Sequence, residues 1–184
     1  MRLQPRSSFH AGFTLVEVLV ALFVVALGIA GAAGLQMLAV RAARDAARLA
    51  DGTRLAWSLR ERMHANPAVV ARPDDANPYL QLDYDAGSGA PAVAASCYAD
   101  TACDPDDLAR FDVFDVSTAL AASFPGGRVR VCRDAALPDA MGLPAWTCDG
   151  RAGAPVVVKI GWRAQGDTAT GAPKVMLPVA GAVP

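Results

Sequence analysis

One early stretch of the chain is continuously apolar. Residues 18–35 are 18 residues without a charged or strongly polar side chain, and about 20 such residues in a helix span the hydrocarbon core of a bilayer. Residues 1–12 precede the stretch with two arginines, Arg2 and Arg6, and no acidic residue. Because arginine favours the cytoplasmic side of a membrane, the pattern predicts a single span whose C-terminal side lies outside the cytoplasm.

The helix is predicted to continue well beyond the membrane. After Gln36 the chain is rich in alanine, leucine and arginine, which favour helices, and the next proline is Pro67. We therefore expect one helix over residues 13–66, of which 13–36 is the transmembrane part. Its outer half is partly amphipathic, with apolar positions that should pack and five arginines that should face solvent: Arg41, Arg44, Arg48, Arg60 and Arg62.

Residues 67–184 predict one globular domain. Four prolines and a Gly-Ser-Gly turn in residues 67–96 predict a long irregular connection. Asp104 and Pro105 suit the N-cap and first position of a helix, which should end near Ser123. Three strands of a small antiparallel sheet are expected after this helix, over residues 128–132, 155–163 and 174–179.

The expected middle strand alternates between two kinds of side chain. Val156, Val158 and Ile160 fall on one face, while Lys159 and Arg163 fall on the other. This alternation is typical of a half-buried strand, whose apolar face should meet the long helix. The predicted fold class is therefore α+β, a long N-terminal helix packed on a small antiparallel sheet.

The chain has four cysteines, all beyond the apolar stretch: Cys97, Cys103, Cys132 and Cys148. An even number in a translocated region is typical of disulfides formed in an oxidising compartment. Three pairings are possible. Sequential pairing closes the two shortest loops, so we expect Cys97 to bond Cys103 and Cys132 to bond Cys148. The spacing is not CxxC, which argues against redox or zinc chemistry.

Charge and histidine content exclude several functions. The net charge of −1 falls to about −3 without Arg2 and Arg6, so the chain has no basic footprint for nucleic acid. His10 and His64 are the only histidines. Two histidines are too few to make a histidine-activated nucleophile or a histidine-ligated metal site a reasonable expectation. We therefore expect no catalytic residue, metal or cofactor.

Two groups of acidic residues have structural interpretations. The run DPDD at residues 104–107 lacks the 12-residue loop, glycine and final glutamate of an EF-hand, so we interpret it as helix capping. Asp83 and Asp85 are spaced for one face of a strand, but no acid, base or pocket pattern accompanies them. We interpret them as part of a solvated loop rather than as paired catalytic carboxylates.

The start of the apolar stretch carries a specific motif, GFTLVEVLVALFVVAL, after a basic leader that ends in Gly12. It resembles the N-terminal signature of type IV pilins and pseudopilins. The resemblance implies that prepilin peptidase, a membrane enzyme, cuts between Gly12 and Phe13 and methylates the new amine of Phe13. An ordinary secretory signal is cut after its apolar region, whereas here the apolar helix would survive processing.

Glu17 places a carboxylate near one end of the span, where a charge is disfavoured. The resemblance implies that Glu17 pairs with the Phe13 amine of a neighbouring subunit and sets axial register during assembly. A plain signal anchor, the simpler alternative, gives Glu17 no such role.

A more dispersed resemblance covers residues 97–163. Cys97 and Cys103 flank a short loop, ALAASFPGGRVRVC leads to Cys132, and VVVKIGWR contains Trp162. These features resemble PilV-type minor pilins, the type IV pilus modification proteins. The resemblance implies a subunit that starts in the inner membrane with a periplasmic domain and then enters a surface filament. There it would prime pilus assembly and join a tip complex with other minor and major pilins and a large tip adhesin, supporting twitching motility and adhesion.

Two other functions stay open at this point. A pseudopilin of a type II secretion system shares the features of the first 40 residues, and the cysteine-bearing domain favours the pilus over it. A membrane-anchored periplasmic enzyme is the alternative from another class. The lack of a His, Ser or metal constellation argues against it, so we do not expect an enzyme.

Overall fold

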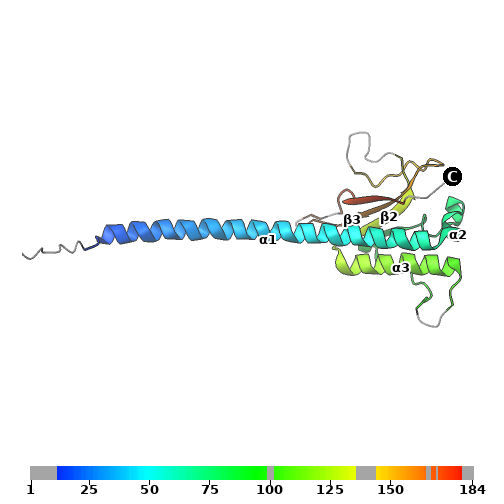
Figure 1. The fold of residues 1–184 in the computed structure, drawn as a ribbon, viewed down its shortest axis with the longest axis horizontal. Helices are drawn as coiled ribbons and strands as arrows, with labels where there is room; N and C mark the ends of the chain where they lie inside the picture. Colours follow the sequence, from blue (N-terminus) through cyan, green and yellow to red (C-terminus); the bar gives the residue numbers. More distant parts are fainter. Residues whose placement is uncertain (1–11, 99–101, 136–143, 165–166, 169, 180–184) are drawn as a thin grey trace, which may run out of the picture. The chain divides into compact units, whose positions relative to one another are not determined.

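The computed structural model describes residues 12–98, 102–135, 144–164, 167–168 and 170–179. These residues form helices and one sheet (Figure 1). In chain order the elements are α1 (Leu15–Ala65), α2 (Pro67–Val70), the 3-10 turn η1 (Asp74–Ala76), β1 (Asp83–Asp85), the 3-10 turn η2 (Ala86–Ser88), α3 (Pro105–Ser123), β2 (Arg128–Arg133), β3 (Val156–Gly161) and β4 (Val175–Val179).

Helix α1 is continuous, in agreement with the helix predicted over residues 13–66. No proline or turn sequence interrupts it, and it ends before Pro67, which begins the short helix α2. The chain forms two compact units, Met1–Asp45 and Ala46–Pro184, and the boundary between them falls within α1. The two units are described separately below.

The sheet of the second unit has the order β1-β2-β3-β4, and each neighbouring pair is antiparallel. Strands β2, β3 and β4 are the three predicted strands. The expectation of an irregular connection over 67–96 is wrong at β1, where Asp83 lies opposite Arg130. Asp83 also accepts hydrogen bonds from the Arg128 guanidinium at 3.0 and 3.1 Å. Ion pairs of Asp83 with Arg128 and Arg130 therefore hold this short edge strand, together with Tyr84, which packs against the core.

The core of the second unit lies between α1 and the sheet. Side chains one helical turn apart on α1 are fully buried, and they share one cluster with the apolar face of β3. The residues of this contact are Ala56, Leu59, Met63, Val156, Val158 and Ile160. The packing confirms the predicted α+β class, and its spacing follows from the 3.6-residue period of the helix and the two-residue period of the strand.

Close contact between α1 and the end of β3 requires a glycine. A β-carbon at Gly52 would lie 2.6 Å from Cζ3 of Trp162, and the Trp162 ring is buried and packs on Phe124. Glycine in a helix costs about 1 kcal/mol relative to alanine. Here it allows the indole ring to lie directly against the helix backbone.

The other face of β3 is also buried, which corrects the expectation of a half-buried strand. All of Val156–Gly161 is buried, because residues 144–154 cross this face. Trp146 from that segment lies against Gly161. Lys159, expected on a half-exposed face, is 0% exposed.

Helix α3 packs on the other side of α1 (Figure 1). It begins as predicted, because the Asp104 carboxylate accepts a hydrogen bond from the Asp107 N–H at 2.9 Å and Pro105 follows the cap. Arg62, expected in solvent, instead forms ion pairs with Asp112 at 3.0 Å and Asp115 at 2.6 Å. The last turns of α1 are thus covered by α3 on one side and by the sheet on the other.

Candidate processing and assembly site

Gly12, Phe13 and Thr14 form a short non-helical segment ahead of α1. All three residues are exposed, and Phe13 is 82% exposed. Exposed, non-helical backbone is the usual substrate of a protease. The bond between Gly12 and Phe13, predicted to be cut, lies in such a segment.

Thr14 is the N-cap of α1. Its Oγ1 accepts a hydrogen bond from the Glu17 N–H at 3.3 Å, and its carbonyl accepts one from the Val18 N–H. Thr14 and Glu17 have the T-x-x-E spacing of a capping box. Thr14 is not among the residues predicted from the sequence, although this spacing ahead of an apolar run is a recognised signal for a helix start.

Glu17 lies exposed in the first turn of α1. The unpaired N–H groups at the start of a helix favour a carboxylate there. In the part of the chain that the structure describes, no cation forms an ion pair with Glu17. Its carboxylate is therefore available to a cation outside that part.

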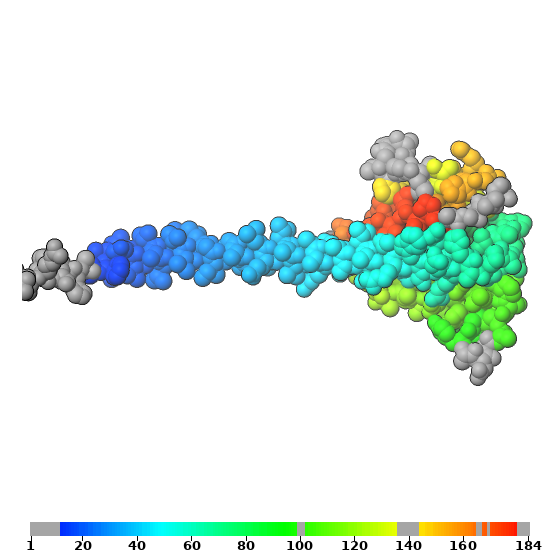
Figure 2. Space-filling model, in the orientation of Figure 1, coloured from blue at the N-terminus to red at the C-terminus, as the bar shows by residue number. Residues whose placement is uncertain are grey.

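Helix α1 is long and apolar enough near its N-terminus to cross a membrane, by length and composition. Residues 15–47 are all exposed in the isolated chain, and Figure 2 shows one face of this bare helix. Its large apolar side chains include Phe23, 64% exposed, and Leu35, 71% exposed. A continuous apolar surface of this size needs lipid or other apolar helices around it, which supports membrane anchoring.

The four cysteines are bonded in sequence order. Cys97 joins Cys103 with Cα atoms 5.7 Å apart, and Cys132 joins Cys148 with Cα atoms 6.3 Å apart. The first bridge closes a loop ahead of α3. The second ties β2 to the segment that crosses the outer face of the sheet. Bridges of this kind contribute about 2–4 kcal/mol of stability each.

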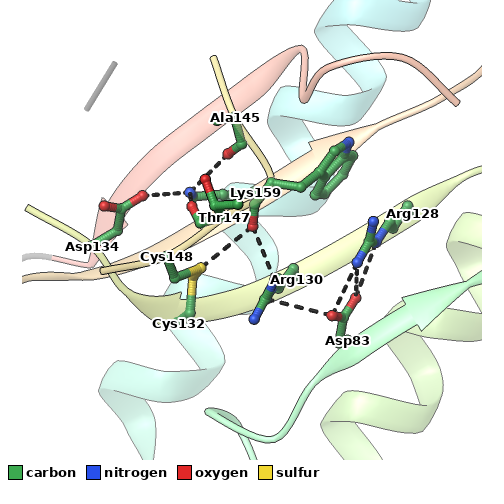
Figure 3. A network of polar contacts seen from close by, with 10 residues as sticks. Asp83, Arg128, Arg130, Cys132, Asp134, Ala145, Thr147, Cys148 and Lys159 are labelled. Atoms are coloured by element: carbon green, nitrogen blue, oxygen red, sulfur yellow. Dashed lines mark hydrogen bonds and ion pairs between the residues drawn. A yellow bond between two sulfur atoms is a disulfide. The ribbon is translucent and has the colours of Figure 1, made fainter. Parts of the chain in front are cut away.

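A buried ammonium group holds the same segment on the sheet (Figure 3). Lys159 donates to the carbonyls of Ala145 at 2.9 Å and Thr147 at 2.6 Å, and it forms an ion pair with the Asp134 carboxylate. An ammonium group has three N–H donors, and each has an acceptor here. The arrangement is that of a structural tether, because no donor is left for a substrate.

A second polar cluster joins α1, α3 and the segment after η1. Tyr79 is fully buried and donates to Asp112 at 2.7 Å. Burial and then the bond to Asp112 raise the pKa of the Tyr79 hydroxyl above its usual value. Burial lowers the pKa of Arg62, but its bonds to Asp112 and Asp115 outweigh this and raise it. Tyr79 and Arg62 therefore keep their ordinary protonation states at neutral pH, and the cluster is structural.

The raised pKa of Tyr79 predicts a loss of stability in alkali. An unfolded tyrosine ionises near pH 10, so the Tyr79 contribution is complete below about pH 10 and is lost as the pH rises further. The difference in unfolding free energy between the wild type and Tyr79→Phe should shrink by about 1.4 kcal/mol per pH unit above that point. Urea unfolding of both proteins in micelles measures it. If the difference in unfolding free energy stays constant up to about pH 11, the buried Tyr79 hydroxyl does not stabilise the fold in the way proposed.

Comparison with known proteins identifies the N-terminal motif. Residues 8–33 match the prokaryotic N-terminal methylation motif, the signal of type IV pilin-like prepilins. The matched range includes Gly12, Phe13, Thr14 and Glu17. It supports a precursor of a type IV pilin or pseudopilin, which implies processing by prepilin peptidase and assembly with other pilins. Comparisons with curated proteins and with solved structures gave no match.

Proposed function

We propose that the chain is a minor pilin precursor that prepilin peptidase cuts between Gly12 and Phe13 and methylates at the Phe13 amine. The observation that carries this proposal is the methylation motif over residues 8–33 on an exposed, non-helical segment directly ahead of an apolar helix. Residues 1–12 are then a leader, and 13–36 is the anchor in the inner membrane. Residues 67–184 form the periplasmic domain.

The processed subunit leaves the membrane by entering a type IV pilus. Its apolar helix, exposed in the isolated chain, is then covered by the helices of other minor and major pilins instead of lipid. Glu17 has no cation partner within the described residues, and the amine of Phe13 on a neighbouring subunit supplies one. This pair sets the axial register of the entering subunit, as the resemblance to type IV pilins implies.

The domain supports a minor pilin of the PilV type. The three cysteines that carry the resemblance, Cys97, Cys103 and Cys132, all form disulfides. Trp162, in the segment VVVKIGWR, is part of the core. Such a subunit primes assembly, occupies the tip with a large adhesin, and serves twitching motility and adhesion. A pseudopilin of a type II secretion system shares the motif but would act in protein secretion. An experiment that compares secretion with pilus formation therefore distinguishes the two functions.

The test is processing and location. We expect the mature protein from cell envelopes to begin at Phe13, by intact-mass analysis, and to occur in sheared surface pili. Gly12→Val should stay at precursor mass, because the resemblance implies a cut after a leader that ends in glycine, and it should be missing from pili. A mature N-terminus other than Phe13, or normal processing of Gly12→Val, would contradict the proposal. Protein that is processed but needed for secretion rather than for pili would identify a pseudopilin.

A further inference from the structure

The helix turn just beyond the apolar stretch is basic. Between Glu17 and Asp51 the only charged residues are three arginines and Asp45. Two of these arginines, Arg41 and Arg44, lie three residues apart and are exposed. Residues at this spacing share one helix face, so their charges act on the same side of α1.

Within the described residues, no carboxylate is paired with these two charges. In the part that the structure describes, neither Arg41 nor Arg44 forms an ion pair. Asp45 is four residues after Arg41 and so lies on the same helix face, but within the described residues the two side chains form no ion pair. Several arginines of the second unit differ, since Arg62 and Arg72, for example, pair with carboxylates. The positive charges of Arg41 and Arg44 are therefore not neutralised by a carboxylate in the described part of the chain.

The arginine side chains point back toward the apolar stretch. Helical side chains tilt toward the N-terminus, and the Arg41 guanidinium donates to Sδ of Met37 at 3.6 Å. Met37 is only two residues beyond Leu35, the last residue of the uncharged stretch, which is about 3 Å along a helix. The polar layer of one leaflet is about 5–8 Å thick. The Arg41 guanidinium therefore falls at the level of lipid phosphates.

We propose that Arg41 and Arg44 bind the phosphate groups of anionic phospholipids in the leaflet at the C-terminal end of the span. The inference rests on the membrane insertion included in the proposed function. A thioether is a weak acceptor, so the contact with Met37 leaves most Arg41 donors free, and the planar guanidinium fork matches a phosphate group. After removal of a leader that carries Arg2 and Arg6, these are the arginines nearest the span. They fix the depth of the processed subunit until it enters a filament.

The test uses the full chain in micelles and native mass spectrometry, with phosphatidylglycerol or phosphatidylcholine as the added lipid. The wild type should bind phosphatidylglycerol more tightly than phosphatidylcholine. Arg41→Gln with Arg44→Gln should weaken phosphatidylglycerol binding by about fivefold per arginine and leave phosphatidylcholine binding unchanged. The matched control is Arg54→Gln, an arginine with a 78% exposed side chain in the second unit, which should change neither affinity. Replacing both Arg41 and Arg44 with lysine should restore part of the preference.

Each other outcome overturns the inference. Equal binding of the two lipids by the wild type removes the headgroup preference, and unchanged phosphatidylglycerol binding by the double glutamine variant removes the role of these arginines. If that variant binds lipid normally but enters pili poorly, the partner is an acidic surface of another subunit instead. A chain that is not recovered in the membrane fraction overturns the proposed function as well, whereas an inserted chain without lipid preference leaves that function intact.

Discussion

Asp134→Ala should destabilise the second unit by about 3–5 kcal/mol, because it leaves the buried ammonium of Lys159 without its carboxylate. Asp134 and Lys159 are 2% and 0% exposed, so water cannot replace the lost partner without opening the structure. The carbonyls of Ala145 and Thr147 remain, but they carry only partial charges. A domain with a total stability of about 5–15 kcal/mol would lose a large fraction of it.

Urea unfolding of the full chain in micelles, followed by tryptophan fluorescence, measures this loss. The matched control is Asp83→Ala on the same face of the sheet, where the ion pair with Arg128 is partly exposed. That change should cost at most about 1 kcal/mol. Asp134→Ala combined with Lys159→Met should recover part of the loss, since removing both charges avoids an unpaired one. Equal effects of Asp134→Ala and Asp83→Ala would contradict the buried tether.

Glu17→Ala should be cleaved, translocated and disulfide-bonded normally but should be nearly lost from purified pili. In the proposed function, cleavage depends on the segment that includes Gly12 and Phe13, which the substitution leaves unchanged. Assembly depends there on a charge pair between Glu17 and the Phe13 amine of another subunit, which the substitution removes. The measurement compares the subunit in the membrane fraction with the subunit in sheared filaments. Membrane levels should be the same for both proteins.

Glu17→Gln separates assembly from helix capping. Glutamine can serve in a capping box as glutamate does, so a pure capping role would allow Glu17→Gln to enter pili normally. A charge pair predicts that Glu17→Gln fails as completely as Glu17→Ala. Thr14→Ala removes the cap and keeps the charge, and we expect it to retain most of its assembly. Wild-type amounts of Glu17→Ala in filaments would reject the charge pair and leave the fold unaffected.

The elements that could be predicted are those specified by adjacent residues. The uncharged run and the absence of proline specify α1, Asp104 and Pro105 specify the start of α3, and the alternation around Val158 specifies β3. In each case the signal lies within one element, because helix caps and side-chain periods are local properties of the backbone.

The features that were missed depend on distant partners. Strand β1 pairs with β2, where Asp83 meets Arg128, 45 residues away, and three residues are too few for their alternation to predict a strand. Arg62 is partly buried because it forms an ion pair with Asp112 on α3. Lys159 is buried because residues 144–154 cross its face, and a single-strand pattern cannot show what covers a sheet. In the candidate site, Gly12, Phe13 and Glu17 could be predicted from the motif alone, whereas the partner that we propose for Glu17 belongs to another chain.

The lysine tether also affects how the second disulfide can form. Lys159 binds the carbonyls of Ala145 and Thr147, and Cys148 is the next residue after Thr147. On the facing strand, Cys132 lies opposite Val157, two residues from Lys159. The ion-dipole contacts therefore raise the effective concentration of one thiol near the other. We expect the reduced chain to oxidise Cys132 with Cys148 in preference to mispairing with Cys97 or Cys103, because the buried charge of Lys159 holds the segment of Cys148 against the sheet.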